Sequence, residues 1–120
     1  MNTRVPFEKY PLRIYELSRQ ISLQDHEFEF IHDHKQRHRK IITESLLSET
    51  QKKFFTDLLE TEGVIKITVK TTSIFVWIWP GFEWNDIEPK IEKKISSCPI
   101  TDSDLEEQKE IVIKDWKENK

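Results

Sequence analysis

All four histidines of the chain lie between positions 26 and 38, so the imidazole groups are concentrated in one short segment. His32 and His34 are two residues apart, a spacing that places both on one face of a strand, and His38 follows four residues later. Imidazole-rich sets of this kind bind zinc or nickel, and these three histidines are therefore a candidate metal site. The alternatives are a solvated polar connection and a surface that binds an anion or an acidic partner.

The single cysteine, Cys98, excludes an intrachain disulfide and any cysteine-only zinc or iron–sulfur site within one chain. No histidine lies near it in sequence to act as a base, and Pro99 directly after it indicates a helix end. The sequence contains no glycine-rich phosphate loop, no Gly-x-Ser-x-Gly elbow and no His-Glu-x-x-His helix. We therefore predict a protein that is not an enzyme.

The charges are unevenly distributed along the chain. Residues 34–40 carry four positive charges and no acid, and Arg37, Arg39 and Lys40 are the candidate nucleic-acid contacts in this segment. From Asp102 onwards seven acids face four lysines. The net charge of −3 argues against a protein that coats nucleic acid, and two solvated faces of opposite sign are the alternative.

The elements that would position such residues are clearest around an apolar hairpin at residues 64–79. Two segments rich in β-branched and aromatic residues flank the turn at Thr71-Thr72, which predicts two antiparallel strands. A loop of even length pairs aliphatic residues only, and this face is predicted to belong to the core. The predicted pairs are Val69 with Ile74, Ile67 with Val76 and Ile65 with Ile78.

The other face of the same hairpin combines lysines with aromatic rings. The candidate partner-binding surface consists of Lys66, Lys70, Phe75, Trp77 and Trp79. If this face is open, its rings form a stacking platform of the kind that single-stranded RNA binders use. If it is closed, the N-terminal arm, the last helix or a second copy of the chain covers it. A large exposed apolar patch is unusual on a monomer, which favours burial or a partner interface.

Helical patterns flank the hairpin. Ser48 and Gln51 have capping-box spacing, which predicts a helix over 48–62 that ends at Gly63, and isoleucines four residues apart predict a second helix over 85–97. We predict a single α+β domain over residues 1–120, in which both helices pack on one face of a small antiparallel sheet centred on the hairpin. Its best-defined core is residues 48–97.

The ends of the chain give weaker patterns. Residues 1–10 read as an extended arm, and Pro11 is placed to begin a short helix. Alternation over 26–32 and the segment 39–42 predict two strands. The C-terminal segment contains Ile111-Val112-Ile113, which is compatible with a strand, but a capping-box pattern at Ser103 and Glu106 favours a short helix.

From Leu58 through Ile95 the sequence resembles the N-terminal domain of Nfu-type iron–sulfur scaffold proteins. The matching positions are Leu58-Leu59, Glu62-Gly63-Val64, Ile67, Ile74-Phe75-Val76, Trp84, Ile87, Pro89, Ile91 and Ile95. The opening Thr-Pro-Asn-Pro strand of the family and its separate Cys-x-x-Cys cluster-binding domain are not present in this sequence. The resemblance implies an α+β domain that serves protein interaction or positioning and holds no cluster.

The leading prediction is a non-catalytic protein-interaction or assembly module of iron–sulfur biogenesis, which has a protein partner or forms a homo-oligomer and holds no cofactor. One alternative is a protein that binds single-stranded RNA or the ribosome, and a second is a histidine-based zinc or nickel protein. The 120 residues include no apolar run of the roughly 18 residues that a transmembrane helix needs, and no apolar signal core. We therefore expect a cytoplasmic protein without a membrane partner.

Overall fold

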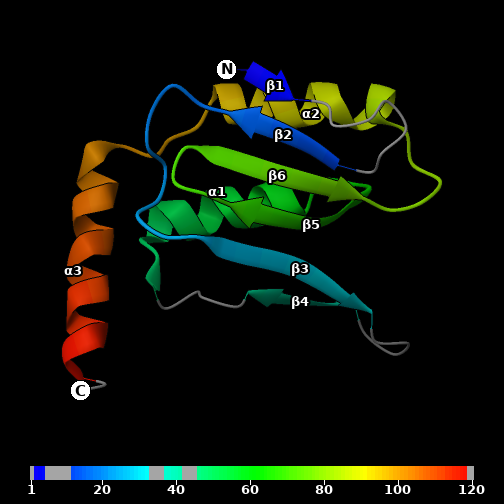
Figure 1. Ribbon diagram of the computed structural model, residues 1–120. Helices are drawn as coiled ribbons and strands as arrows, with labels where there is room; N and C mark the ends of the chain where they lie inside the picture. The colour runs from blue at the N-terminus through cyan, green and yellow to red at the C-terminus, as the bar shows by residue number, and fades with distance from the viewer. Residues whose placement is uncertain (1, 5–11, 33–36, 42–45, 119–120) are drawn as a thin grey trace.

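The computed structural model describes the backbone of residues 2–4, 12–32, 37–41 and 46–118, and the side chains of residues 12–27 and 46–118 (Figure 1). Its strands are β1 (Asn2–Arg4), β2 (Leu12–Glu16), β3 (His26–His32), β4 (Arg37–Ile41), β5 (Val64–Val69) and β6 (Ser73–Ile78). Its helices are α1 (Glu49–Leu59), α2 (Trp84–Ser96) and α3 (Asp102–Glu118). The described strands form one antiparallel sheet in the order β1-β2-β6-β5-β3-β4. The predicted α+β class is therefore confirmed.

The β5–β6 hairpin lies at the centre of this sheet. Val69 pairs with Ile74 and Ile67 pairs with Val76, as the alternation of aliphatic residues predicts. The third predicted pair, Ile65 with Ile78, is wrong, because a β-bulge between Val64 and Lys66 makes Val64 the partner of Ile78. The bulge buries Val64 and leaves Ile65 half-exposed, since one extra residue must fit into β5.

Helices α1 and α2 lie side by side on one face of the sheet, as predicted (Figure 1). Ser48 caps α1 through the predicted capping box. Its Oγ accepts from the backbone N–H of Gln51, and the side-chain Oε1 of Gln51 accepts from the backbone N–H of Ser48. One buried cluster joins the two helices to the sheet. It contains the aliphatic residues of β5 and β6 other than Ile65, together with Phe54, Phe55, Leu58 and Leu59 of α1 and Ile87, Ile91 and Ile95 of α2. Burying each such side chain contributes about 1.5–3 kcal/mol, which makes this layer the main source of stability.

The predicted short N-terminal helix is wrong, because Leu12–Glu16 is strand β2, paired with β6. The period of burial is two residues: Tyr15 is fully buried beside Ile74, whereas its neighbour Ile14 pairs with Phe75 and is half-exposed. Of the predicted extended arm, Asn2–Arg4 forms β1 along the edge of β2, and residues 5–10 lie outside the described residues.

Segment 26–32 is a strand, as predicted. The second strand was predicted over 39–42 and is found over 37–41, two residues earlier at its start, and Ile42 lies outside the described residues. The C-terminal segment is a helix, as favoured, but it is 17 residues long and begins earlier than Ser103. Its first turn is held by Asp104, whose carboxylate accepts from the amide and hydroxyl of Thr101. Helix α3 lies across one end of the sheet and does not cover its aromatic side (Figure 1).

Candidate functional site

The face of the sheet opposite α1 and α2 carries the predicted aromatic surface. No helix of the described part of the chain lies on this face (Figure 1). Because burial alternates along β6, Phe75 and Trp77 point away from the core, and both are half-buried. We call this surface the aromatic face; its described members are Leu12, Ile14, Lys66, Lys70, Phe75 and Trp77.

The two rings on this face lie close to one another and to two ammonium groups. The ring centroids of Phe75 and Trp77 are 6.1 Å apart. Lys66 Nζ lies 4.9 Å from the Trp77 centroid and Lys70 Nζ lies 6.0 Å from the Phe75 centroid, both within cation–π range. Trp79 follows the last paired residue of β6 and is also half-buried. The structure therefore brings together Lys66, Lys70, Phe75 and Trp77 of the predicted surface.

The two lysines of the aromatic face are also paired with acids. Lys66 Nζ lies 3.3 Å from Glu27 Oε1, and Lys70 Nζ lies 2.9 Å from Asp25 Oδ2. A nucleobase that stacks on Trp77 would have to compete with the Lys66 ammonium for the ring, and the neighbouring phosphates would meet two carboxylates. This arrangement is better suited to a neutral or mixed-charge protein surface than to a polyanion.

The predicted nucleic-acid residues Arg37, Arg39 and Lys40 fall on β4, an edge strand. In Cα register Lys40 pairs with Glu29 of β3, which pairs in turn with Lys66 of β5. The backbone thus places Lys40 and Lys66 on the two sides of one acidic position. The side chains of β4 lie outside the described part of the structure, and their role stays a prediction.

The histidines are divided among several positions. His32 is the last residue of β3 and pairs in Cα register with Arg37, whereas His38 on β4 pairs with Ile31. His34 lies outside the described residues. Among the residues whose side chains are described, no group of three potential metal ligands is found. The zinc or nickel site stays a prediction, because the three histidines fall outside that set.

Cys98 lies just after α2, half-buried, beside a small cavity of about 340 Å³. The described residues lining this cavity are Leu17, Ser18, Arg19, Ile95, Ser96 and Cys98. Arg19 Nη2 donates a hydrogen bond to the carbonyl oxygen of Cys98. None of these lining residues is a general base that would activate a thiol.

A buried polar network joins α3 to the rest of the molecule, and no sequence pattern pointed to it. Gln108 Oε1 accepts from Gln51 Nε2 at 2.7 Å and from the Leu23 amide at 3.0 Å. Gln108 Nε2 donates to Ser22 Oγ at 3.1 Å and lies 3.4 Å from His26 Nε2. Gln108 is the one buried residue among those described in α3. The network therefore fixes the position of that helix.

His26 gives this network a dependence on pH. Burial lowers the pKa of His26 below its ordinary value, and the nearby Asp25 carboxylate opposes this with a smaller effect. The neutral His26 ring accepts a hydrogen bond from Gln108 Nε2 at its own Nε2. When His26 Nε2 carries a proton, two hydrogen-bond donors face each other and this bond is lost. Because the unfolded chain binds the proton more readily, stability is full above about pH 6.5 and falls as the pH decreases below it.

We therefore expect the free energy of unfolding, measured by urea denaturation, to fall between about pH 7 and pH 5.5. His26→Gln keeps a hydrogen-bond acceptor without a titratable ring, and its unfolding free energy should depend less on pH over this interval. Equal pH dependence in the wild type and in His26→Gln would show that other groups cause the effect.

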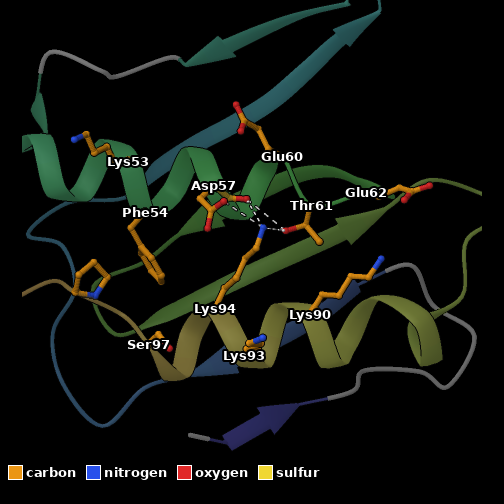
Figure 2. A pocket seen from close by; sticks show the side chains of 11 residues that line it. Lys53, Phe54, Asp57, Glu60, Thr61, Glu62, Lys90, Lys93, Lys94 and Ser97 are labelled. Atoms are coloured by element: carbon orange, nitrogen blue, oxygen red, sulfur yellow. Dashed lines mark hydrogen bonds and ion pairs between the residues drawn. The ribbon is translucent and has the colours of Figure 1, made fainter.

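A groove of about 780 Å³ runs between α1 and α2 on the outer side of the helix layer (Figure 2). Lys94 crosses it: its Nζ donates to Thr61 Oγ1 at 2.8 Å and to the Asp57 carbonyl oxygen at 3.0 Å, and lies 3.3 Å from Asp57 Oδ1. The groove is lined by Lys53, Phe54, Asp57, Glu60, Thr61, Glu62, Lys90, Lys93, Lys94, Ser97 and Pro99. In the sequence, Lys90, Lys93 and Lys94 lie between the buried isoleucines of α2. This pattern is the sequence signal that could have indicated a lysine-lined groove.

No protein-family model, curated protein or solved structure matches this chain. The resemblance to the N-terminal domain of Nfu-type scaffolds therefore stays a prediction. None of the described helices combines the length and the apolar character that crossing a membrane requires.

Proposed function

We propose that this protein is a non-catalytic protein-interaction or assembly module that binds a protein partner through the aromatic face. The observation that carries the proposal is the pair Phe75 and Trp77, half-exposed on a side of the sheet that no described helix covers. Trp79 directly follows β6, and the alternation of side chains along the strand predicts that it extends the same surface. Tryptophan is enriched among the residues that dominate the energy of protein interfaces, and a half-exposed ring buries much of its area when a partner binds.

The surroundings of the rings favour a protein partner over RNA. Leu12 and Ile14 of β2 pair with Trp77 and Phe75 and extend the surface with aliphatic side chains. The two described ammonium groups near the rings, Lys66 and Lys70, each have a carboxylate within 3.3 Å. A surface of this kind offers an apolar centre with balanced charges around it, which is the usual composition of a protein interface.

The resemblance to Nfu-type scaffolds supports a more specific proposal, in which the partner belongs to iron–sulfur assembly. The resembling positions 58–95 contain the end of α1, the β5–β6 hairpin and α2, which together form the centre of the fold. In this proposal the chain positions a cluster-carrying protein and does not itself bind the cluster.

The test is a calorimetric titration of this protein with an isolated Cys-x-x-Cys domain of an Nfu-type scaffold. We expect binding that Trp77→Ala weakens by about tenfold or more, because the ring is central to the face. Trp116→Ala on α3 removes an indole elsewhere and should leave the affinity unchanged. Absence of binding would contradict the iron–sulfur partner, and steeply salt-dependent binding of a single-stranded RNA oligomer would favour the nucleic-acid alternative.

Trp77→Ala is also expected to lower the free energy of unfolding by about 1–2 kcal/mol, since only part of the indole is buried. The loss comes from the contact with Phe75 and from the Lys66 ammonium over the ring. Chemical denaturation of the variant and the wild type measures it. A loss as large as that of a fully buried aromatic residue would show that another part of the chain covers the ring and would contradict an accessible binding face.

A further inference from the structure

The aromatic face holds a positive charge at a point where a ring and a carboxylate meet. Lys66 Nζ lies 4.9 Å from the centroid of the Trp77 ring and 3.3 Å from Glu27 Oε1. The face of the ring is electron-rich and the carboxylate carries a full negative charge, so both groups favour a cation at this point. We call the position of this ammonium group the first cation subsite.

A second cation subsite of the same composition lies further along β5. Lys70 Nζ lies 6.0 Å from the centroid of the Phe75 ring and 2.9 Å from Asp25 Oδ2. The carboxylate side chains of the two subsites are 50% exposed at Glu27 and 60% exposed at Asp25. Both negative groups are therefore accessible to a cation that arrives from outside the chain.

A buried hydroxyl without a hydrogen bond lies between the two subsites on β5. Thr68 is on the same side of the strand as the two lysines, and it pairs with Glu27 of β3 and Phe75 of β6. It is only 7% exposed, and its Oγ1 has no hydrogen-bond partner among the described residues. A buried hydroxyl without a partner lowers stability, so a ligand that brings an N–H donor to Thr68 Oγ1 removes this cost.

The lysines that fill the subsites can be replaced at low cost. Exposed ion pairs contribute little, because they hold two long side chains in one conformation. The side chains of Lys66 and Lys70 are 29% and 40% exposed, so both ammonium groups can move into the solvent. An arginine guanidinium is less strongly hydrated than an ammonium, stacks flat on a ring and has several N–H donors for carboxylate and hydroxyl oxygens. Arginine therefore suits these subsites better than lysine does.

The spacing of the rings matches that of side chains on an extended segment. The centroids of Phe75 and Trp77 are 6.1 Å apart. Side chains two residues apart on an extended chain point to the same side and are about 6.6 Å apart. Two arginines separated by one residue can therefore lie over the two rings at the same time.

We propose that the aromatic face binds an extended segment of a protein partner that carries two arginines separated by one residue. The inference rests on the proposed function and specifies the partner's chemistry. In the complex each guanidinium stacks on one ring and pairs with the carboxylate of that subsite, and one of them donates to Thr68 Oγ1. Lys66 and Lys70 move out into the solvent. In the free protein these two lysines compete with the partner for the subsites.

NMR titration of the isotope-labelled full chain with short peptides tests the proposal. The first peptide has threonine at every position except two arginines separated by one residue, and the second has citrulline in place of both arginines. Citrulline keeps the shape of the side chain and removes its charge. We expect the arginine peptide to bind at least about tenfold more tightly. The indole N–H signal of Trp77, identified by its loss in Trp77→Ala, should shift on binding.

Substitution of the two lysines gives the more specific result. K66M/K70M removes the internal competitors and should strengthen binding of the arginine peptide about three- to tenfold. Glu27→Gln removes a carboxylate and should weaken binding about threefold or more. The control Lys90→Met removes an exposed positive charge from α2, on the opposite side of the sheet, and should change the affinity by less than about twofold.

Equal affinity for the arginine and citrulline peptides would overturn the proposal. So would weaker binding of the arginine peptide to K66M/K70M, or tighter binding of a glutamate peptide that needs the two lysines, because the face would then select an acidic partner. These outcomes leave the proposed function to its own titration. A scaffold domain that binds in a Trp77-dependent manner, together with peptides that show no preference for arginine, would keep the interaction module and exclude only the arginine segment.

Discussion

Gly63→Ala is expected to lower the free energy of unfolding by about 2–4 kcal/mol, because two separate costs meet at this residue. Gly63 has a φ of +92°, a backbone conformation that costs a residue with a Cβ about 1–2 kcal/mol. A Cβ at this position would also lie 2.6 Å from Ile87 Cδ1 and 2.7 Å from Phe82 Cδ1. Phe82 is exposed enough to move, but Ile87 is buried and its displacement disturbs the packing of α2.

Gly81→Ala is the matched control for this prediction. Gly81 has nearly the same φ, +94°, but no atom lies within 4 Å of the position of its Cβ. Gly81→Ala should therefore show the backbone cost alone, about 1–2 kcal/mol. Urea denaturation of both variants measures the difference. Equal losses would mean that Ile87 and Phe82 rearrange without cost, which would contradict the close approach of the α1–β5 turn to α2.

Gly63 also illustrates which parts of the fold the sequence could predict. Three features act through local stereochemistry: the glycine after an amphipathic stripe, the capping box at Ser48 and Gln51, and the alternating aliphatic residues of the hairpin. Such features place α1, α2 and the β5–β6 hairpin within a few residues. They determine the aromatic face as well, because the opposite side of a strand is set once the core side is known.

The incorrect predictions depend on partners distant in sequence. The spacing of Ile14, Leu17 and Ile21 suits a helix, but pairing with β6 selects a strand and buries Tyr15 instead. The β-bulge before Lys66 likewise depends on how β5 joins Gly63, whose carbonyl oxygen accepts from the Trp79 amide. Neither arrangement leaves a local pattern in the residues that form it.

The candidate surfaces differ in the same way. Lys66, Lys70 and the rings of β6 could be predicted because they alternate along two adjacent strands. Their neutralisation by Glu27 and Asp25 could not, because it requires β3 to lie beside β5. The groove between α1 and α2 depends on the packing of two helices about 30 residues apart, for which a single sequence offers no register.

The second large effect is expected for Gln108→Leu, which should lower the free energy of unfolding by about 2–4 kcal/mol. Leucine fills a similar volume but leaves the Leu23 amide without its acceptor and Ser22 Oγ without the Gln108 donor. One hydrogen of Gln51 Nε2 also loses its partner in a fully buried position. Because Gln108 is the buried residue of α3, hydrogen exchange over residues 102–118 should accelerate more than exchange in the β5–β6 hairpin.

A double-mutant cycle with Gln51→Leu distinguishes a network from independent contacts. Two leucines can pack against each other where the two amides were bonded, so the double variant should lose less stability than the two single variants together, with a coupling of about 1 kcal/mol or more. Lys109→Gln, exposed on the next position of α3, should change the unfolding free energy by less than about 0.5 kcal/mol. Additive losses, or exchange that accelerates equally throughout the molecule, would contradict the assignment of Gln108 as the residue that holds α3.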